Sequence, residues 1–274
     1  MNTRQVSKVK VALVTGGSSG IGAATALMLA NAGIKVYAGS RRGTSPVEHP
    51  LLIPVKLDVN DEALTAAVVE SIVKADGRLD AVVCNAGAGI YGPVEGTTDA
   101  EAREQFETTY FGSLKSIRCC LPVFRKQGFG RIITITSVMA VLQLPYQAFY
   151  SSAQAALLSL SQSLSLELKG TGIQCCSILP GDVATGFTGA RKKTAAAQDP
   201  ASPYKAGMEK NLAKIEADEL GGMSPDVIAK AVLKQLKRKH MAVRVIPRAD
   251  YKAVGLLVRI LPAKWVLAII SKIY

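Results

Sequence analysis

The sequence predicts an α/β fold: a doubly wound, mostly parallel sheet with helices on both faces, followed by a C-terminal helical extension. Short apolar runs rich in β-branched residues alternate with longer helical patterns along the chain. A glycine-rich turn joins the first apolar run to the first helical pattern. The chain has 274 residues, 49% of them hydrophobic, which excludes a disordered chain and a small disulfide scaffold.

The first third of the chain contains a β-α-β series. Gly33 supplies a C-terminal stop for its first helix. Parallel strands connected by helices are covered on both faces, so their residues are expected to be apolar throughout. The expected elements are strands at 11–14, 35–38, 53–57 and 81–84, and helices at 21–31 and 62–74.

The alternation continues downstream, and right-handed crossovers then predict a doubly wound sheet. The expected elements are helices at 100–127 and 149–169, and strands at 131–136, 173–178 and 242–245. We expect a single domain over residues 1–250. Within it, residues 181–221 are rich in Gly, Ala, Thr and Lys without strong periodicity, which predicts a functional or mobile loop.

Residues 251–274 form an apolar and basic tail. Pro262, Arg259, Lys264 and Lys272 interrupt its apolar run, so two short amphipathic helices fit it better than a transmembrane span. The pattern leaves three roles open: packing on its own domain over a pocket, packing on a partner subunit, and peripheral contact with a membrane surface.

Charge and rare residues narrow the function classes. The net charge is +12, and residues 201–274 carry +8 of it, with 14 Lys/Arg and 6 Asp/Glu. Aromatic and basic residues are not interleaved, so nucleic-acid binding is not expected. Five cysteines without CxxC spacing, and a polar start at residues 1–10 instead of a signal peptide, favour a reduced cytoplasmic protein. Only two histidines are present, so we expect neither a Ser-His-Asp triad nor a metal site.

The segment Thr15-Gly16-Gly17-Ser18-Ser19-Gly20-Ile21-Gly22 directly follows the first expected strand. Its glycines allow a sharp turn and a close approach to a pyrophosphate, and the following helix directs its first N–H groups at that anion. The GxxxGxG spacing differs from the GxGxxG fingerprint, and a glycine turn alone is common between strand and helix.

Together with this loop, Asn85-Ala86-Gly87, Ser137, Tyr150 and Pro180-Gly181 occur in the order and spacing of the short-chain dehydrogenase/reductases. The chain resembles this family over residues 10–245. The stretches VCNAG and YGPVE are similar to the branch that contains 17β-hydroxysteroid and retinol dehydrogenases. The resemblance implies a Rossmann-type fold, a nicotinamide dinucleotide, a small-molecule carbonyl or alcohol substrate, and pairing of the two long central helices into a homodimer or homotetramer.

NADP(H) is preferred over NAD(H) at the end of the second strand. An NAD site usually has a carboxylate there for the ribose 2′-hydroxyl, whereas an NADP site needs a cation for the 2′-phosphate. Ser40 stands in the carboxylate's place, and Arg41 and Arg42 follow it. The full set of expected cofactor residues is Gly16, Ser18, Ser19, Gly20, Ile21, Gly22, Ser40, Arg41, Arg42, Asp58, Val59, Asn85, Ala86, Gly87, Tyr150, Gln154, Pro180, Gly181, Val183 and Thr185.

The expected catalytic residues are Tyr150, Ser137, Gln154 and Thr109, and two of them depart from the family pattern. The resemblance gives the tyrosine the proton transfer, the serine the carbonyl oxygen, a lysine the ribose and the tyrosine pKa, and an asparagine a relay water. Here Gln154 stands where YxxxK has lysine, and Thr109 stands where asparagine is usual. Gln154 can hydrogen-bond a ribose but cannot stabilise a phenolate by charge.

Two functions therefore remain open. The first is an NADP(H)-dependent reductase of a lipophilic ketone or aldehyde, with Tyr150 as the acid and Ser137 as the carbonyl anchor. Loss of the lysine impairs alcohol oxidation more, because oxidation needs the phenolate. The alternative is an NADP-binding pseudoenzyme, a sensor or structural partner, in which Gln154 and Thr109 mark the loss of hydride transfer.

Overall fold

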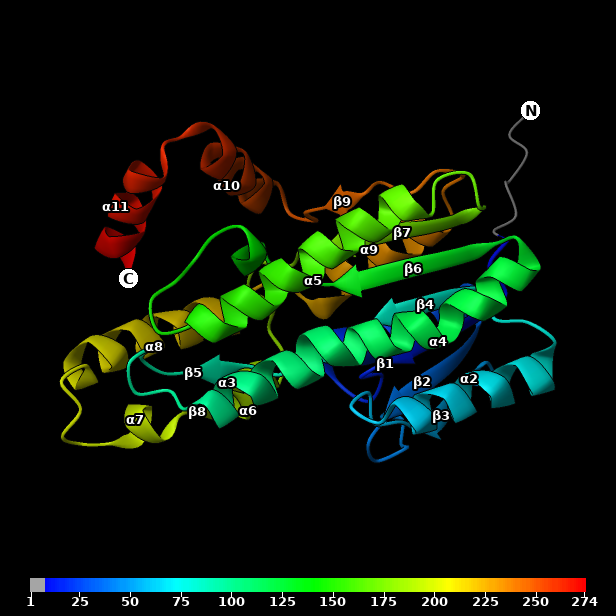
Figure 1. The fold of residues 1–274 in the computed structure, drawn as a ribbon, viewed down its shortest axis with the longest axis horizontal. Helices are drawn as coiled ribbons and strands as arrows, with labels where there is room; N and C mark the ends of the chain where they lie inside the picture. Colours follow the sequence, from blue (N-terminus) through cyan, green and yellow to red (C-terminus); the bar gives the residue numbers. More distant parts are fainter. Residues whose placement is uncertain (1–7) are drawn as a thin grey trace.

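A computed structural model of the chain, which describes residues 8–274, has the predicted fold class (Figure 1). Its main sheet consists of β1 (Val11–Thr15), β2 (Lys35–Ser40), β3 (Leu52–Lys56), β4 (Ala81–Cys84), β6 (Gly130–Ile135), β7 (Ile173–Ile178) and β9 (Arg244–Val245). These seven strands are parallel, in the order β3-β2-β1-β4-β6-β7-β9. The order reverses between β1 and β4, which is where doubly wound sheets bind ligands.

Helices cover both faces of this sheet. On the face turned to the viewer in Figure 1 lie α2 (Glu62–Asp76), α4 (Gly112–Gln127) and α5 (Ala148–Glu167). On the other face, α1 (Gly20–Asn31) packs against α9 (Pro225–Leu236). All residues of β1 and β4 are buried, which explains why these strands are apolar without alternation.

The predicted long helix at 100–127 is a continuous helical run with a wider turn inside it. The run starts as α3 (Asp99–Phe106), passes through the π-helical turn η1 (Glu107–Phe111), and continues as α4. Thr98 and Glu101 form a capping box at its start. A π-turn shifts the register of the side chains that follow it and often lies at a functional site. Here it contains Thr109.

Residues 181–221, where we expected an aperiodic substrate loop, contain regular helices and a short strand. The segment contains α6 (Phe187–Ala190), β8 (Lys192–Lys193), α7 (Ala195–Gln198) and the long helix α8 (Lys205–Leu220). β8 pairs with β5 (Ile90–Tyr91), which closes the segment over the end of the sheet. The expectation of an aperiodic loop was wrong for α8, because this helix buries only Met208, Asn211 and Ile215. With only three buried positions, one of them an asparagine, the helix has no clear apolar periodicity in its sequence.

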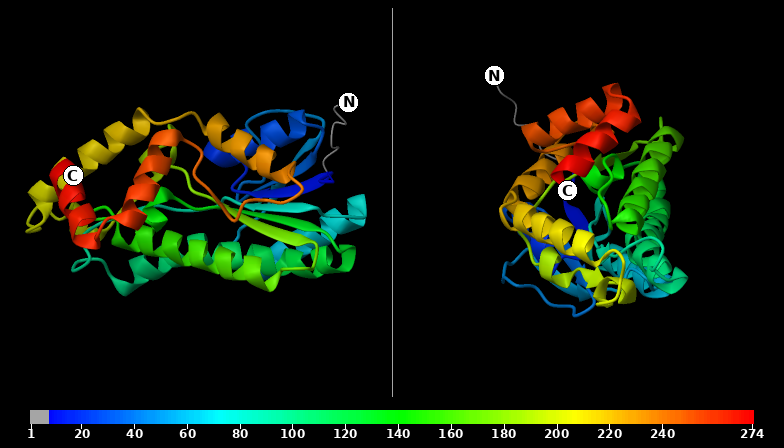
Figure 2. Two further views of the ribbon diagram at one scale, coloured as in Figure 1. Left: turned by 90° about the horizontal axis from the view of Figure 1, so that it is seen from above. Right: turned by 90° about the vertical axis from the view of Figure 1, so that its left-hand side faces the viewer.

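The tail forms the two predicted amphipathic helices, α10 (Ala249–Ile260) and α11 (Ala263–Ile273). Two tyrosines fix them to the domain. The Tyr251 hydroxyl contacts Asp182 beyond β7, and the Tyr274 hydroxyl donates to Asp218 of α8 at 3.1 Å. Figure 2 shows the tail lying across the end of the molecule that α8 forms. Among the helices described, none has both the length and the apolar character that crossing a membrane requires.

A buried hydroxyl network holds α5 on the sheet. Thr134 of β6 lies 2.9 Å from the hydroxyl of Ser161 on α5 and 2.9 Å from that of Ser177 on β7. Ser161 also donates to the Leu157 carbonyl at 2.8 Å. All three hydroxyl-bearing residues are at most 1% exposed. The network therefore sets the position of the helix that carries Tyr150 and Gln154.

We predict that Thr134→Val lowers the free energy of unfolding by about 1–3 kcal/mol, because it leaves two buried hydroxyl groups without their shared partner. Urea denaturation measures this. Thr44→Val is the control, because Thr44 is exposed and makes no described hydrogen bond, so its stability is expected to stay at the wild-type value. Equal stability of the two variants would contradict the importance of the network.

Candidate active site

The glycine turn brings the start of α1 into direct contact with the ends of β1 and β4. Gly16 and Gly20 have positive φ angles of 67° and 52°. A Cβ on Gly22 would lie 2.1 Å from the Gly16 carbonyl oxygen, so only glycine fits there. Ser19, at the N-cap, makes no side-chain capping bond. The first N–H groups of α1 thus remain available to an anion such as a pyrophosphate.

Asn85 braces this turn from the neighbouring strand. Its side-chain amide donates to the Thr15 carbonyl at 3.0 Å and to the Gly16 carbonyl at 3.3 Å. The Thr15 hydroxyl in turn accepts the backbone N–H groups of Asn85 and Ala86. Thr15 was not singled out from the sequence, because a threonine at the end of a β-rich strand gives no sign of this role. Ala86 and Gly87 line the crevice between β1 and β4.

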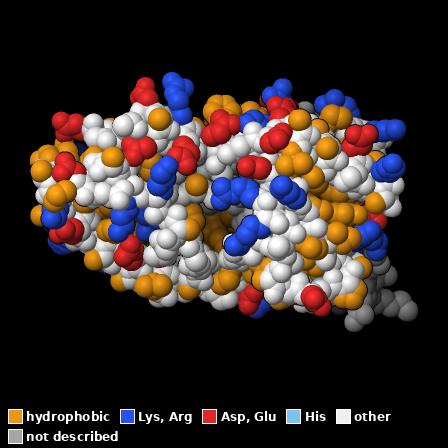
Figure 3. All heavy atoms as spheres, turned by 90° about the horizontal axis from the view of Figure 1, so that it is seen from below, with side chains coloured by type: hydrophobic (Ala, Val, Ile, Leu, Met, Phe, Trp, Pro, Cys, Tyr) orange, Lys and Arg blue, Asp and Glu red, His pale blue; other side chains and the backbone are white. Residues whose placement is uncertain are grey.

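The residues expected at the adenosine end follow β2 and β3. The Ser40 side chain is buried, and its oxygen accepts the Gly43 N–H at 3.1 Å, so it shapes the turn. Arg41 and Arg42 are exposed and form no ion pair within residues 8–274. Asp58 accepts the Asn60 N–H, and Val59 is buried. Figure 3 shows a hollow near the middle of this side of the molecule, with Lys and Arg side chains beside it.

Ser137 and Tyr150 lie together beyond the end of β6. Ser137 is 8% exposed and caps the short helix η2 (Val138–Ala140), where its oxygen accepts the Met139 N–H at 3.1 Å. The hydroxyl proton of Ser137 is therefore free to be donated. Tyr150 stands in the first turn of α5 and interacts with Ser137 and Gln154. Ser137, Tyr150 and Gln154 therefore form one group of interacting polar side chains.

Gln154 follows Tyr150 by one turn of α5 and is 5% exposed. Its Oε1 atom is buried and has no hydrogen-bond partner among the described residues. Such an orphaned acceptor is costly unless a ligand donates to it. A ribose hydroxyl beside Tyr150 meets that need. Together with the glycine cradle, this atom fits a nicotinamide dinucleotide, with the pyrophosphate at the start of α1 and the ribose at Gln154.

Thr109 lies in the π-turn η1 and is 2% exposed. Its hydroxyl accepts the Gln105 side-chain amide at 2.9 Å, and its carbonyl accepts the Ser113 hydroxyl at 2.8 Å. Gln105 Oε1 is a second buried acceptor without a described partner. Gln105 was missed in the sequence because its position in a charged helix predicts exposure. Gln105 and Thr109 thus form a pair of buried polar side chains at the position where the family resemblance implies an asparagine.

The loop after β7 covers the nicotinamide side of the site. The Pro180 carbonyl accepts the Val138 N–H at 2.8 Å, which joins this loop to η2. Gly181 accommodates the Tyr251 ring, because a Cβ there would lie 2.3 Å from it. Val183 is buried, and the Thr185 side chain lies close to Gly20. The loop therefore faces the glycine turn across the crevice.

The lid formed by α6, β8, α7 and α8 brings an ion pair near Tyr150. The Arg191 guanidinium is 2% exposed, contacts Glu219 and stacks 5.8 Å from the centre of the Phe187 ring. That ring lies 5.9 Å from the Tyr150 ring. Arg191 Nε and Nη1 have no described partner. The burial of this arginine could not be predicted from the sequence, because an Arg-Lys-Lys run usually indicates an exposed surface.

The pKa of Tyr150 is raised above its ordinary value. Burial is the main cause, because it disfavours the charged phenolate. Hydrogen bonding to Ser137 lowers the pKa, Glu219 raises it, and Gln154 and Arg191 lower it. The carboxylate and the guanidinium of the lid thus oppose each other. The other lysines near the site are no substitute for a lysine at 154: Lys115 is paired with Glu107, and Lys169 is exposed at the far end of α5.

Comparisons with known proteins identify the family and the fold. The family model described as short chain dehydrogenase matches residues 10–196. A 3-ketodihydrosphingosine reductase of Bacteroides thetaiotaomicron is 35% identical over 258 residues, which cover 93% of this chain and 91% of the relative.

Solved structures share the fold. One is a short chain dehydrogenase/reductase of Burkholderia phymatum in complex with NAD, with TM-score 0.78 and 22% identity, covering 92% of each chain. Another is a short chain dehydrogenase of Burkholderia cenocepacia in complex with NADP, with TM-score 0.75 and 24% identity, covering 96% of this chain and 97% of that one.

We predict that Gly22→Ala weakens cofactor binding by more than about tenfold and lowers the free energy of unfolding by about 1–3 kcal/mol, because the added carbon displaces α1 from β1. NADPH fluorescence titration and urea denaturation measure the two effects. The matched control is Gly189→Ala on α6, where an added Cβ meets no atom within 4 Å. Unchanged cofactor affinity in Gly22→Ala would show that the turn does not form the pyrophosphate site.

Proposed function

The chain belongs to the short-chain dehydrogenase/reductase family and is an oxidoreductase whose fold relatives bind NAD or NADP, and from this premise we propose that it uses NADPH to reduce a lipophilic ketone or aldehyde. The observation that carries the proposal is the interaction of Tyr150 with Ser137 and with Gln154, whose buried Oε1 atom has no hydrogen-bond partner among the described residues. The two hydroxyl groups can hold one carbonyl oxygen, and Gln154 can hold the ribose.

In this reaction the substrate's carbonyl oxygen accepts hydrogen bonds from Ser137 and Tyr150. The bound cofactor supplies the hydride, which adds to the carbonyl carbon. Tyr150 gives its phenolic proton to the oxygen as negative charge develops there, so the product is an alcohol. Ser137 orients the oxygen with its hydroxyl hydrogen, while its own oxygen accepts the Met139 N–H. Gln154 positions the ribose.

The substitutions at 154 and 109 favour reduction over oxidation. Reduction requires neutral Tyr150, and burial already favours that form. Oxidation requires the phenolate, which Gln154 cannot stabilise by charge. Thr109 and Gln105 place buried polar groups, among them the unpartnered Gln105 Oε1, where a water that returns the proton to Tyr150 could bind. A reductase can therefore function without the lysine.

The apolar surroundings of the two hydroxyl groups support a lipophilic substrate. Val138 and Met139 of η2 directly follow Ser137, and the Phe187 ring packs on the Tyr150 ring. The Tyr146 ring packs against the rings of Tyr91 and Tyr204. The Bacteroides relative is named as the reductase of 3-ketodihydrosphingosine, which is a long-chain ketone. We propose a ketone of this class as the first substrate to be tested.

We also propose a homo-oligomer formed through α4 and α5 and a location in the cytoplasm. The surface of α5 carries Leu166, which is 77% exposed, and Phe111, the last residue of η1 directly before α4, is 42% exposed. Apolar side chains on two adjacent helices suit an isologous interface. All five cysteines are free, and four of them are buried, as expected in a reducing compartment.

We predict that the rates of ketone reduction and alcohol oxidation depend differently on pH. The raised pKa of Tyr150 keeps it protonated, so NADPH-dependent reduction stays level from about pH 6 to about pH 9. Oxidation rises about tenfold per pH unit over that range, because it follows the phenolate fraction. Gln154→Lys adds a positive charge, which lowers the Tyr150 pKa and accelerates oxidation at neutral pH by about tenfold or more.

Initial rates with long-chain ketones and alcohols measure these profiles, with Tyr150→Phe as the inactive control. Absence of turnover by the unaltered chain over the whole panel, with activity gained only in Gln154→Lys, Thr109→Asn, would favour the NADP-binding pseudoenzyme instead. Full activity of Tyr150→Phe would remove Tyr150 from the reaction.

We predict that Arg41→Ala weakens NADPH binding by about tenfold to a hundredfold and changes NADH affinity by less than about twofold, since a charge-assisted bond to the 2′-phosphate is lost. Fluorescence titration with both cofactors measures the difference. The exposed Arg118 on α4 supplies the control variant Arg118→Ala. An equal loss of NADH and NADPH affinity would place the 2′-phosphate elsewhere.

A further inference from the structure

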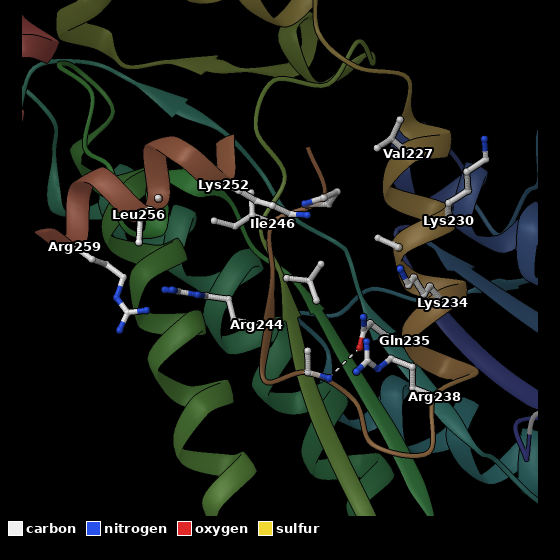
Figure 4. Close-up of a pocket in the computed structure, with 15 residues that line it drawn as sticks. Val227, Lys230, Lys234, Gln235, Arg238, Arg244, Ile246, Lys252, Leu256 and Arg259 are labelled. Atoms are coloured by element: carbon white, nitrogen blue, oxygen red, sulfur yellow. Dashed lines mark hydrogen bonds between the residues drawn. The ribbon is translucent and has the colours of Figure 1, made fainter. Parts of the chain in front are cut away.

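A groove of about 600 Å³ lies between α9, the β9 segment and α10, away from the crevice of the active site. Figure 4 shows that its labelled cations come from three segments: α9 and the residues after it on one side, β9 in the middle and α10 on the other. None of the residues that line the groove is acidic. Its six cations are Lys230, Lys234, Arg238, Arg244, Lys252 and Arg259.

These cations have no neutralising partner. Among the described residues, no ion pair involves any of the six, and the only hydrogen bond made by one of their side chains runs from Arg238 Nε to the His240 carbonyl at 3.0 Å. Six like charges around one groove repel each other and create a strongly positive potential. An anionic partner relieves this repulsion, so the groove is complementary to negative charge.

The helices beside the groove expose an unusual amount of apolar surface. Of the thirteen large hydrophobic side chains that are exposed among residues 8–274, seven lie within α10 and α11. Each is more than half exposed. No acidic residue follows Asp250, whereas Lys264 and Lys272 add positive charge. The seven side chains are Leu256, Leu257, Ile260, Trp265, Leu267, Ile269 and Ile273.

We propose that the groove and the tail helices together form a docking surface for a bilayer that contains anionic phospholipids. The groove cations bind lipid phosphates, and the apolar side chains of α10 and α11 enter the interface between headgroups and acyl chains. Trp265, Ile269 and Ile273, spaced four residues apart, line one side of α11 and suit this depth.

Two other occupants fit less well. A second copy of the chain would bring an equally basic tail to a basic groove, which places like charges together. A nucleic acid would leave the seven apolar side chains in water, and the groove contains no aromatic residue on which a base could stack. The combination of positive charge and apolar surface is specific to an anionic lipid surface.

If the proposed function holds, docking would also act on the segments that cover the substrate. Tyr274 joins the end of α11 to Asp218 of α8, and Lys214 lies 5.7 Å from the centre of the Tyr274 ring. Tyr251 joins α10 to the loop after β7 through Asp182. The surface that contacts the bilayer is therefore attached to both segments that cover the substrate.

The test is co-flotation of the full chain with vesicles, either of phosphatidylcholine alone or of equal amounts of phosphatidylcholine and phosphatidylglycerol. We expect binding to the anionic vesicles only, with weakening at high salt. The groove variant Lys230→Gln, Lys234→Gln, Arg238→Gln and the tail variant Trp265→Ser, Ile269→Ser should each lose at least about tenfold in partition.

A matched charge control is Lys74→Gln, Lys126→Gln, Lys169→Gln, whose lysines lie on the opposite, α2-α4-α5 face of the sheet. It should bind within about twofold of wild type. Absence of wild-type binding, equal loss in the groove variant and this control, or preference for a DNA duplex over the vesicles would each overturn the proposal. NADPH affinity and melting temperature, measured on every variant, verify folding, and vesicle binding requires no turnover, so it is independent of the proposed reaction.

Discussion

The close approach of α1 to the ends of β1 and β4 is the constraint on which the site depends. Gly22 lies against the Gly16 carbonyl with no room for a Cβ, and Asn85 holds the same turn through the Thr15 and Gly16 carbonyls. This contact fixes the direction of the helix N-terminus at the switch point of the sheet. In the proposed complex, a cofactor that starts at this point would extend toward Gln154, Ser137 and Tyr150.

The features that could be predicted from the sequence are those that depend on a short stretch of chain or on a fixed spacing between residues. The buried strands could be predicted because both faces are covered, which makes them apolar throughout, as in β1 and β4. The glycine turn, the Ser137 to Tyr150 spacing and the missing lysine at 154 could also be read directly. The two helices of the tail followed from Pro262 and the spacing of the cations.

The remaining features depend on contacts between distant segments. Arg191 is buried because Glu219, 28 residues away, meets it under the lid. Gln105 is buried because the π-turn and the Ala88 carbonyl enclose it. α8 has few buried positions and so little periodicity. The cationic groove arises from three segments whose charges are ordinary surface residues when each is considered alone.

In the proposed reaction, Gln154 and Thr109 shift the site toward reduction, while Ser137 and Tyr150 retain their places. Burial favours the neutral phenol, and the opposed charges of Arg191 and Glu219 do not replace a lysine that adjoins Tyr150. The most direct test of the account is a single turnover with NADPH deuterated at the nicotinamide C4 position, with 3-ketodihydrosphingosine as the substrate and mass spectrometry of the product. The account predicts an alcohol that carries one deuterium on the former carbonyl carbon. Tight binding of the labelled cofactor without transfer of deuterium, to this or any other long-chain ketone, would contradict it.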